Sequence, residues 1–189
     1  MQFANDIKEC INVLQKGGLI LYPTDTIWGI GCDATNEKAV AKIYQLKKRA
    51  DEKSMIILLA TQKDLPQYIT HTPKDIFAYL NKVTKPTTII YDGAIHLATN
   101  IINKDGSIAI RIVNDEFCKQ LITNFKKPIV STSANISSFP SPQNFNGIDS
   151  AIKNGVDYIV QHRQNDVTPT TPSTIIKYNT DGAIQIIRL

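Results

Sequence analysis

The sequence predicts an α/β fold, in which helices pack around a twisted sheet of mixed parallel and antiparallel strands. Apolar patterns of helical spacing alternate with short β-rich runs early in the chain, which is typical of helices that pack on a sheet. Two β-rich runs lie close together near the end, which favours an antiparallel pair. No repeat or linker divides the 189 residues, so we expect a single domain over residues 1–189.

The first quarter of the chain is predicted to form a helix and then a strand. Ile7, Ile11 and Leu14 recur at the spacing of an amphipathic helix. Gly17-Gly18 ends this helix, because glycine readily adopts the conformation that closes a helix. Leu19 to Tyr22 then forms a short buried strand.

A second helix and a third strand-length run follow. Ala39, Ile43 and Leu46 share one helical face, and the helix ends in the basic run Lys47-Lys48-Arg49. Met55 to Ala60 is continuously apolar, as expected for a strand that is covered on both faces.

The middle of the chain is predicted to add two helices and two strands. Thr72 is placed to cap a helix with Pro73 in its first turn. Thr87 to Tyr91 and Ser107 to Ile112 are β-rich, and Asp105-Gly106 is a turn signal before the second of them. Cys118 to Phe125 has the pattern of another amphipathic helix.

The last third combines a strand, a polar stretch and a hairpin. Pro128 to Val130 reads as a strand that leads into the polar stretch Ser131 to Gln143. Thr174 to Tyr178 and Ala183 to Leu189 read as strands joined by a hairpin loop at residues 179–182.

Composition indicates a globular protein, with 42% apolar and 20% charged residues. The net charge of +4 favours phosphate-bearing partners, although a solvated basic face is the more ordinary explanation. The N-terminus lacks a signal-peptide pattern, and no apolar run is long enough to span a bilayer. We therefore expect a cytoplasmic protein with no membrane partner.

Cysteine and histidine patterns do not indicate a metal site. Cys10, Cys32 and Cys118 are odd in number and far apart, so we expect buried free thiols in a reducing cytosol. The three histidines are scattered, and the sequence has no P-loop or kinase glycine loop. Because no covalent nucleophile stands out either, any mechanism should depend on positioning and charge stabilisation.

Polar residues follow the first predicted strand between Tyr22 and Ala34. Gly29-x-Gly31-x-x-Ala34 resembles a dinucleotide fingerprint, but Gly29 does not directly follow the strand as that motif requires. The ordinary explanation is a turn in which the glycines allow tight bends. Two threonines around Asp25 at a strand end also suit a small polar ligand.

Basic residues gather before the buried strand at Met55. A charge run such as Lys47-Lys48-Arg49, with Lys53 nearby, usually faces water and offsets the helix dipole. Ligands of α/β proteins bind at strand ends, however, and Arg and Lys together suit a triphosphate. Both interpretations remain open from the residues alone.

A third polar stretch, Ser131 to Asn135, follows the strand at Pro128. Hydroxyl groups and an amide in series can bind phosphate oxygens or the edge of a base. A Ser/Thr-rich loop whose Asn caps a turn is equally compatible with the pattern.

These stretches, taken in order, resemble the YrdC/Sua5 family. The match is most specific at Tyr22-Pro-Thr-Asp-Thr-Ile-Trp-Gly-Ile-Gly-Cys-Asp-Ala34. Lys47-x-Arg49 and Ser133-x-Asn135 match two short motifs of the active branch of the family. The supporting matches are Pro86, Thr88, Ile108 to Arg111, Ser173 to Ile176 and Ile186 to Arg188.

The resemblance implies a YrdC-like fold around a deep basic cavity, without the C-terminal domain of longer Sua5 proteins. It also implies the synthesis of threonylcarbamoyl-AMP and pyrophosphate from L-threonine, bicarbonate and ATP, with Mg²⁺ accompanying the ATP. That product would serve the t6A modification of adenosine 37 in tRNA, which partner proteins complete.

The resemblance further implies roles for individual residues. Lys47 and Arg49 would be catalytic. The residues implied to bind threonine are Thr26, Arg111, Ser131 and Ser173. The residues implied to bind the nucleotide are Lys47, Arg49, Lys53, Ser107, Ser133, Asn135, Ser141 and Arg188.

Several positions depart from the family pattern. The usual Trp-Pro-Gly-Pro segment is here Val83-Thr84-Lys85-Pro86, and Leu58 stands where a histidine is common. An alternative function is a non-catalytic module that binds double-stranded RNA or tRNA through phosphate contacts. Retention of Thr26, Ser133 and Asn135 favours the enzyme, because an RNA-binding surface needs the charges but not these groups. A carbamoyl-transfer domain like those of hydrogenase-maturation proteins is a third alternative.

Overall fold

The computed structural model describes residues 3–48, 55–73, 75–178 and 183–188. The α-helices are α1 (Ala4–Gln15), α2 (Glu37–Lys47), α3 (Ile76–Lys82), α4 (Glu116–Phe125) and α5 (Ser150–Asn154). The strands are β1 (Ile20–Tyr22), β2 (Gly29–Gly31), β3 (Ile56–Leu59), β4 (Thr87–Tyr91), β5 (Ile108–Ile112), β6 (Ile129–Ser133), β7 (Tyr158–Ile159), β8 (Thr174–Tyr178) and β9 (Ile184–Arg188). Short 3₁₀ turns are η1 (Gln62–Gln67), η2 (Thr99–Ile101) and η3 (Phe145–Gly147).

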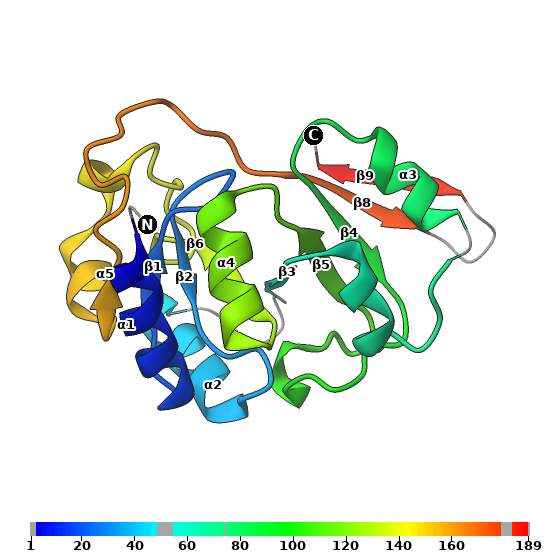
Figure 1. Cartoon of the computed structure of the whole chain (residues 1–189), viewed down its shortest axis with the longest axis horizontal. Coiled ribbons are helices and arrows are strands. Elements are labelled where there is room, and N and C mark those ends of the chain that lie inside the picture. Colours follow the sequence, from blue (N-terminus) through cyan, green and yellow to red (C-terminus); the bar gives the residue numbers. More distant parts are fainter. Residues whose placement is uncertain (1–2, 49–54, 74, 179–182, 189) are drawn as a thin grey trace.

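In the described part of the chain the strands form one nine-stranded sheet in the order β7-β1-β2-β6-β3-β5-β4-β8-β9. The pairs β1–β7, β3–β5 and β4–β8 are parallel and the others are antiparallel, so the predicted mixed α/β sheet is confirmed. Figure 1 shows α1 and α4 side by side against the strands, with the β8–β9 pair at the far end. The hairpin loop predicted at residues 179–182 lies outside the described residues, whereas its two flanking strands do pair antiparallel.

Local signals in the sequence explain where α2 and α4 begin. The side chain of Asn36 accepts a hydrogen bond from the Ala39 amide at the start of α2. Asp115 does the same for α4, accepting from the amide of Cys118 at 2.8 Å. The prediction that Thr72 caps the third helix is wrong, because α3 begins at Ile76 after Asp75.

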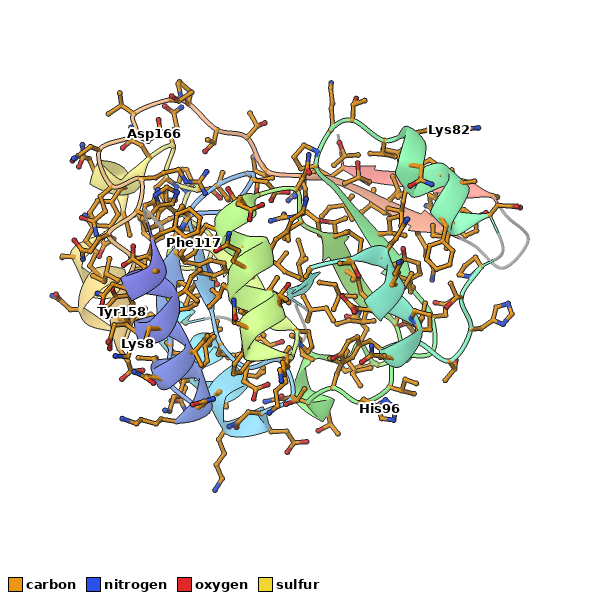
Figure 2. The ribbon with its side chains drawn as sticks, viewed as in Figure 1. Lys8, Lys82, His96, Phe117, Tyr158 and Asp166 are labelled. Carbon is orange, nitrogen blue, oxygen red and sulfur yellow. The ribbon has the colours of Figure 1, made fainter. Side chains whose placement is uncertain are left out.

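The core fills the space between the sheet and the helices. Ile57, Leu58 and Leu59 of β3 are almost fully buried, as the apolar run predicts. Phe117 on α4 meets Phe3 edge to face, with 5.5 Å between the ring centroids, beside the packed helices of Figure 2. All three cysteines are buried and free of disulfides, as expected. No described helix has both the length and the apolar character that a membrane crossing requires.

Two segments that the sequence analysis assigned to turns or loops are strands. Gly29 to Gly31 forms β2, which pairs antiparallel with β1 and β6. Ser131, Thr132 and Ser133 are the second half of β6, because Ser131 pairs with Ile56 and Ser133 with Gly29. Neighbouring strands supply these residues with backbone partners, so the low intrinsic β propensity of Gly29 and Gly31 is overridden.

Close packing explains the glycine at position 31. A Cβ atom on Gly31 would lie 2.6 Å from Cε1 of Tyr22 and 2.8 Å from the carbonyl oxygen of Val130. The Tyr22 hydroxyl donates a hydrogen bond to that same carbonyl at 3.1 Å, so the ring cannot easily move aside. Only glycine therefore fits between the ring and the neighbouring strand.

Replacing Gly31 by alanine should lower the free energy of unfolding by about 1–3 kcal/mol, the usual cost of overpacking a core. The matched control is Gly147→Ala, because a Cβ at Gly147 meets nothing closer than 3.6 Å. That control should change the unfolding free energy by less than about 0.5 kcal/mol. Urea denaturation of both variants measures the difference, and equal effects would contradict the packing explanation.

Candidate active site

A cavity of about 190 Å³ collects most of the predicted site residues. It is bounded by the β1–β2 loop, the ends of β5, β6 and β9, and the segment before β8. The predicted residues that line it are Thr26, Arg111, Ser131, Ser133, Ser141, Ser173 and Arg188. Segments distant in the sequence meet here because β6 and β5 both neighbour β3 in the sheet.

The β1–β2 loop presents a threonine hydroxyl in a defined orientation. The Thr24 hydroxyl donates to the carbonyl of Ile27 at 2.8 Å. Its single proton is thereby used, so the 2.9 Å contact between the two threonine hydroxyls must have Thr26 as donor. Thr26 then keeps lone pairs on Oγ1, and we infer that it can accept a hydrogen bond from a ligand.

Arg111 is the buried cation of the cavity, with 3% of its side chain exposed. Its Nη2 lies 3.1 Å from Asp25 Oδ1, and the other carboxylate oxygen of Asp25 accepts from the Asn114 amide at 3.1 Å. Arg111 Nε is buried and has no hydrogen-bond partner among the described residues. A guanidinium that is held on one side by a carboxylate and keeps an unused donor can bind an oxyanion.

A second guanidinium faces the same cavity from β9. Arg188 donates from Nε and Nη2 to the carbonyl of Ser173, at 3.2 and 2.8 Å. The Ser173 hydroxyl in turn lies 2.8 Å from that of Thr88. Burial, and after it the positive charge of Arg111, lowers the pKa of the Arg188 guanidinium. A bound anion would relieve this repulsion between like charges.

Lys47 connects the end of α2 with the Ser133–Asn135 segment. Its side chain is 1% exposed, and its ammonium group donates to the carbonyls of Ser133 and, at 2.6 Å, of Asn135. Lys47 therefore brings the end of α2 into contact with the segment from Ser133 to Asn135. Its ammonium group is turned to the backbone, however, and the residue is not among those that line the cavity.

The amide of Asn135 also serves the protein backbone. Its Nδ2 donates to the carbonyls of Ile136 at 3.0 Å and Phe139 at 2.7 Å, which closes the turn after β6. Its Oδ1 is buried without a partner in the described part of the chain. This oxygen remains available to accept a hydrogen bond.

Of three other predicted residues, only Ser107 lies in the described part of the chain. Arg49 and Lys53 lie outside the described residues. Ser107 precedes β5, whereas Arg111 lies toward the other end of that strand. The hydroxyl of Ser107 accepts a hydrogen bond from Asn103 Nδ2 at 2.9 Å. Ser107 is thus used to shape a turn and does not line this cavity.

Ser141 reaches the cavity because an aromatic contact holds its loop. Trp28 and Phe145 pack with 4.9 Å between ring centroids, which anchors the loop after β6 against the β1–β2 segment.

The pairing of Asp25 with Arg111 was not predicted from the sequence. The place of Asp25 between two threonines was a signal for it.

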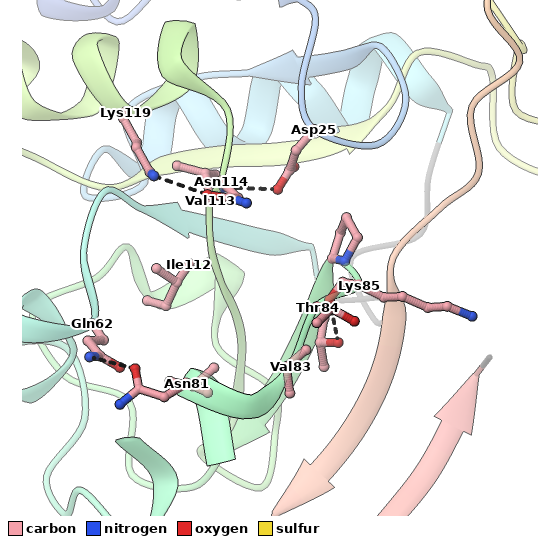
Figure 3. Close-up of a pocket in the computed structure, with 13 residues that line it drawn as sticks. Asp25, Gln62, Asn81, Val83, Thr84, Lys85, Ile112, Val113, Asn114 and Lys119 are labelled. Atoms are coloured by element: carbon pink, nitrogen blue, oxygen red, sulfur yellow. Dashed lines mark hydrogen bonds between the residues drawn. The ribbon is translucent and has the colours of Figure 1, made fainter. Parts of the chain in front are cut away.

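A larger cavity adjoins the first, and a third cavity adjoins this larger one through Asp25, Lys85 and Pro86. The larger cavity, of about 690 Å³, shares Thr26, Pro172 and Arg188 with the first. The third, of about 520 Å³, lies between the α3–β4 loop and the end of β5, with Asp25 on its wall (Figure 3). Within the described ranges, no three His, Cys, Asp or Glu side chains gather to hold a metal ion.

The chain is similar in sequence to curated proteins that share one name. The chain is 32% identical over 139 residues to the threonylcarbamoyl-AMP synthase of Vibrio parahaemolyticus, covering 72% of this chain and 75% of the relative. It is 34% identical over 131 residues to the protein of that name from Saccharophagus degradans, covering 68% of each.

A solved structure shares the fold. Sua5 of P. abyssi, solved in complex with L-threonine, superposes with a TM-score of 0.85 at 24% identity, covering 96% of this chain. This chain spans about half of that one, 53%. The Sua5/YciO/YrdC family model, described as "Telomere recombination", matches residues 12–189. The chain therefore belongs to the Sua5/YciO/YrdC family.

Proposed function

We propose that this chain is a threonylcarbamoyl-AMP synthase, which converts L-threonine, bicarbonate and ATP into threonylcarbamoyl-AMP, pyrophosphate and water. The observation that carries the proposal is the cavity into which Arg111, Arg188 and several Ser and Thr hydroxyls converge. Two curated relatives above 30% identity bear the name of this activity. A nucleotidyl transfer needs cations and hydrogen-bond donors around phosphate oxygens, and these side chains offer them.

The threonine end of the reaction is assigned to Arg111 and Thr26. The unused Nε of Arg111 can donate to an oxyanion, and we assign it to the threonine carboxylate. Thr26 Oγ1 would accept from the substrate's amine or hydroxyl, and Ser131 and Ser173 would line the same side. Held in this way, the amine is directed toward the remaining cavity, where it adds to CO₂ derived from bicarbonate.

The nucleotide end is assigned to Ser133, Ser141, Asn135 and Arg188. The carbamate is already an anion, so its oxygen can attack the α-phosphorus without a general base, and pyrophosphate leaves. Holding carbamate and ATP in line lowers the entropic cost of their encounter. Arg49 and Lys53 are proposed for the phosphates from the sequence motifs alone.

Lys47 is proposed as a positioning residue. Because its ammonium group holds the carbonyls of Ser133 and Asn135, it fixes the direction in which their side chains meet the nucleotide. Lys47 would therefore contribute to catalysis indirectly, by holding the segment from Ser133 to Asn135, and not by contacting the reacting groups.

Mg²⁺ is proposed to enter with ATP, as part of the substrate. Since no cluster of acidic or histidine ligands occurs in the described ranges, phosphate oxygens would provide most of its ligands.

We also propose that the product serves t6A formation in tRNA, completed by partner proteins. An RNA-binding module without activity is distinguished by the assay below.

The primary test follows pyrophosphate release with ATP, bicarbonate and threonine. We expect release only when threonine is present. Arg111→Lys keeps the charge but loses the planar fork, so the KM for threonine should rise about 10- to 100-fold while the KM for ATP changes little. Lys177→Gln, which alters an ion pair with Asp92 away from the cavity, is the control. No threonine-dependent release by the wild type would refute the proposed function.

Lys47→Met should lower kcat about 10²- to 10³-fold, as when a positioned donor is lost. It should also lower the free energy of unfolding by about 1–3 kcal/mol, because two carbonyls lose their buried donor. Turnover and urea denaturation measure the two effects separately. Full activity in a destabilised Lys47→Met protein would show that Lys47 serves only the fold.

Removal of Mg²⁺ by EDTA should abolish pyrophosphate release, and added MgCl₂ should restore it. The melting temperature should stay within about 1 °C, because an ion that does not bind the native protein cannot stabilise it. Differential scanning fluorimetry beside the activity assay provides both readings. A large fall in melting temperature with EDTA would instead indicate a structural metal.

A further inference from the structure

The inner cavity is too small for its proposed substrates. At about 190 Å³ it falls below the range of roughly 300–1,000 Å³ that is usual for sites of drug-sized ligands. ATP and threonine together need more room than this. The adjoining cavity of about 690 Å³ is the natural extension, because the two share Thr26, Pro172 and Arg188.

The charge of this outer cavity is positive. Its described charged side chains are Lys85, Arg188 and Asp25. The carboxylate of Asp25 is already paired with Arg111, which leaves the two cations without an acidic neighbour in the cavity. The ammonium group of Lys85 makes no hydrogen bond or ion pair within the described part of the chain. In Figure 3 its side chain points away from Gln62 and Asn81.

The backbone beneath Lys85 is held in place on both sides. The Thr87 hydroxyl donates to the Lys85 carbonyl at 3.0 Å. The carbonyl of Pro86 accepts from the Thr174 amide at 3.0 Å, which ties this segment to the start of β8. Lys85 is therefore a cation on an anchored segment, in the wall of a cavity that Arg188 also lines.

We infer that Lys85 binds the terminal phosphates of ATP, and the pyrophosphate they become, in the outer cavity. The inference deepens the proposed function and rests on it for the identity of the ligand. Arg111 inside the first cavity is suited to a carboxylate, whereas Lys85 is a compact charge that suits a multiply charged phosphate chain. Hydroxyl groups of Thr171 and Thr174 on the wall can donate to the same oxygens.

Calorimetric titration with pyrophosphate and Mg²⁺ tests this role without requiring turnover. Lys85→Ala should weaken pyrophosphate binding about three- to ten-fold, as expected for a charged contact of an exposed side chain. Lys85→Arg should retain binding within about two-fold, because the charge remains. Binding of AMP, which lacks the terminal phosphates, should be the same in wild type and Lys85→Ala.

The matched control is Lys82→Ala, an exposed lysine at the end of α3 that points into solvent (Figure 2) and lines neither cavity. Equal losses in Lys82→Ala and Lys85→Ala would reduce the effect to net charge and overturn the inference. So would unchanged pyrophosphate binding in Lys85→Ala, an equal loss of AMP binding, or a loss confined to a double-stranded RNA probe. If the wild type shows no threonine-dependent turnover, the proposed function fails, and the pyrophosphate titration still decides the role of Lys85.

Discussion

A guanidinium that is withdrawn from water needs a carboxylate, and Arg111 finds one in Asp25 at 3.1 Å. This ion pair joins the end of β5 to the β1–β2 loop. Because Asp25 also accepts from the amide of Asn114, it fixes the chain where β5 turns toward α4. The orientation of Thr26, the position of the cavity wall and the remaining donor of Arg111 all depend on this pair. Removal of either partner would leave a buried charge unpaired, which is more costly than the pair is stabilising.

The sheet brings the polar residues to one place because segments rich in glycine and serine form strands in it. Gly29 and Gly31 have no side chains with which to pack, yet they lie in a strand, because Tyr22 and strand β6 occupy the space that a Cβ atom would need. Ser131 and Ser133 are two residues apart on β6 and so face the same side of the sheet. A strand holds hydroxyl groups more rigidly than a loop does, which suits a site that acts by positioning.

Lys47 shows how a motif can be recognised correctly while its physical role differs. The basic helix end and the Ser133–Asn135 segment do meet, across 88 residues of sequence. The ammonium group satisfies backbone carbonyls, since a buried lysine must be compensated by close acceptors. Among the described residues, positive charge inside the cavity comes instead from Arg111 and Arg188, whose mutual repulsion contributes to the lowered pKa of Arg188.

Much of the architecture followed from local patterns. Apolar periodicity located α1, α2 and α4, and β-rich runs located β3, β4, β5 and β8, because these elements bury one face or both and carry that pattern in their own residues. The site residues were identified through the family resemblance, because each polar stretch taken alone also fits an ordinary turn, a loop or a solvated face. Local patterns could not predict strand β2, the second half of β6 or the pairing of Arg111 with Asp25. They also could not predict that Ser107 does not line the cavity. Each of these features depends on neighbours tens of residues away, and a strand or a buried charge is defined by the partner that the folded chain places beside it.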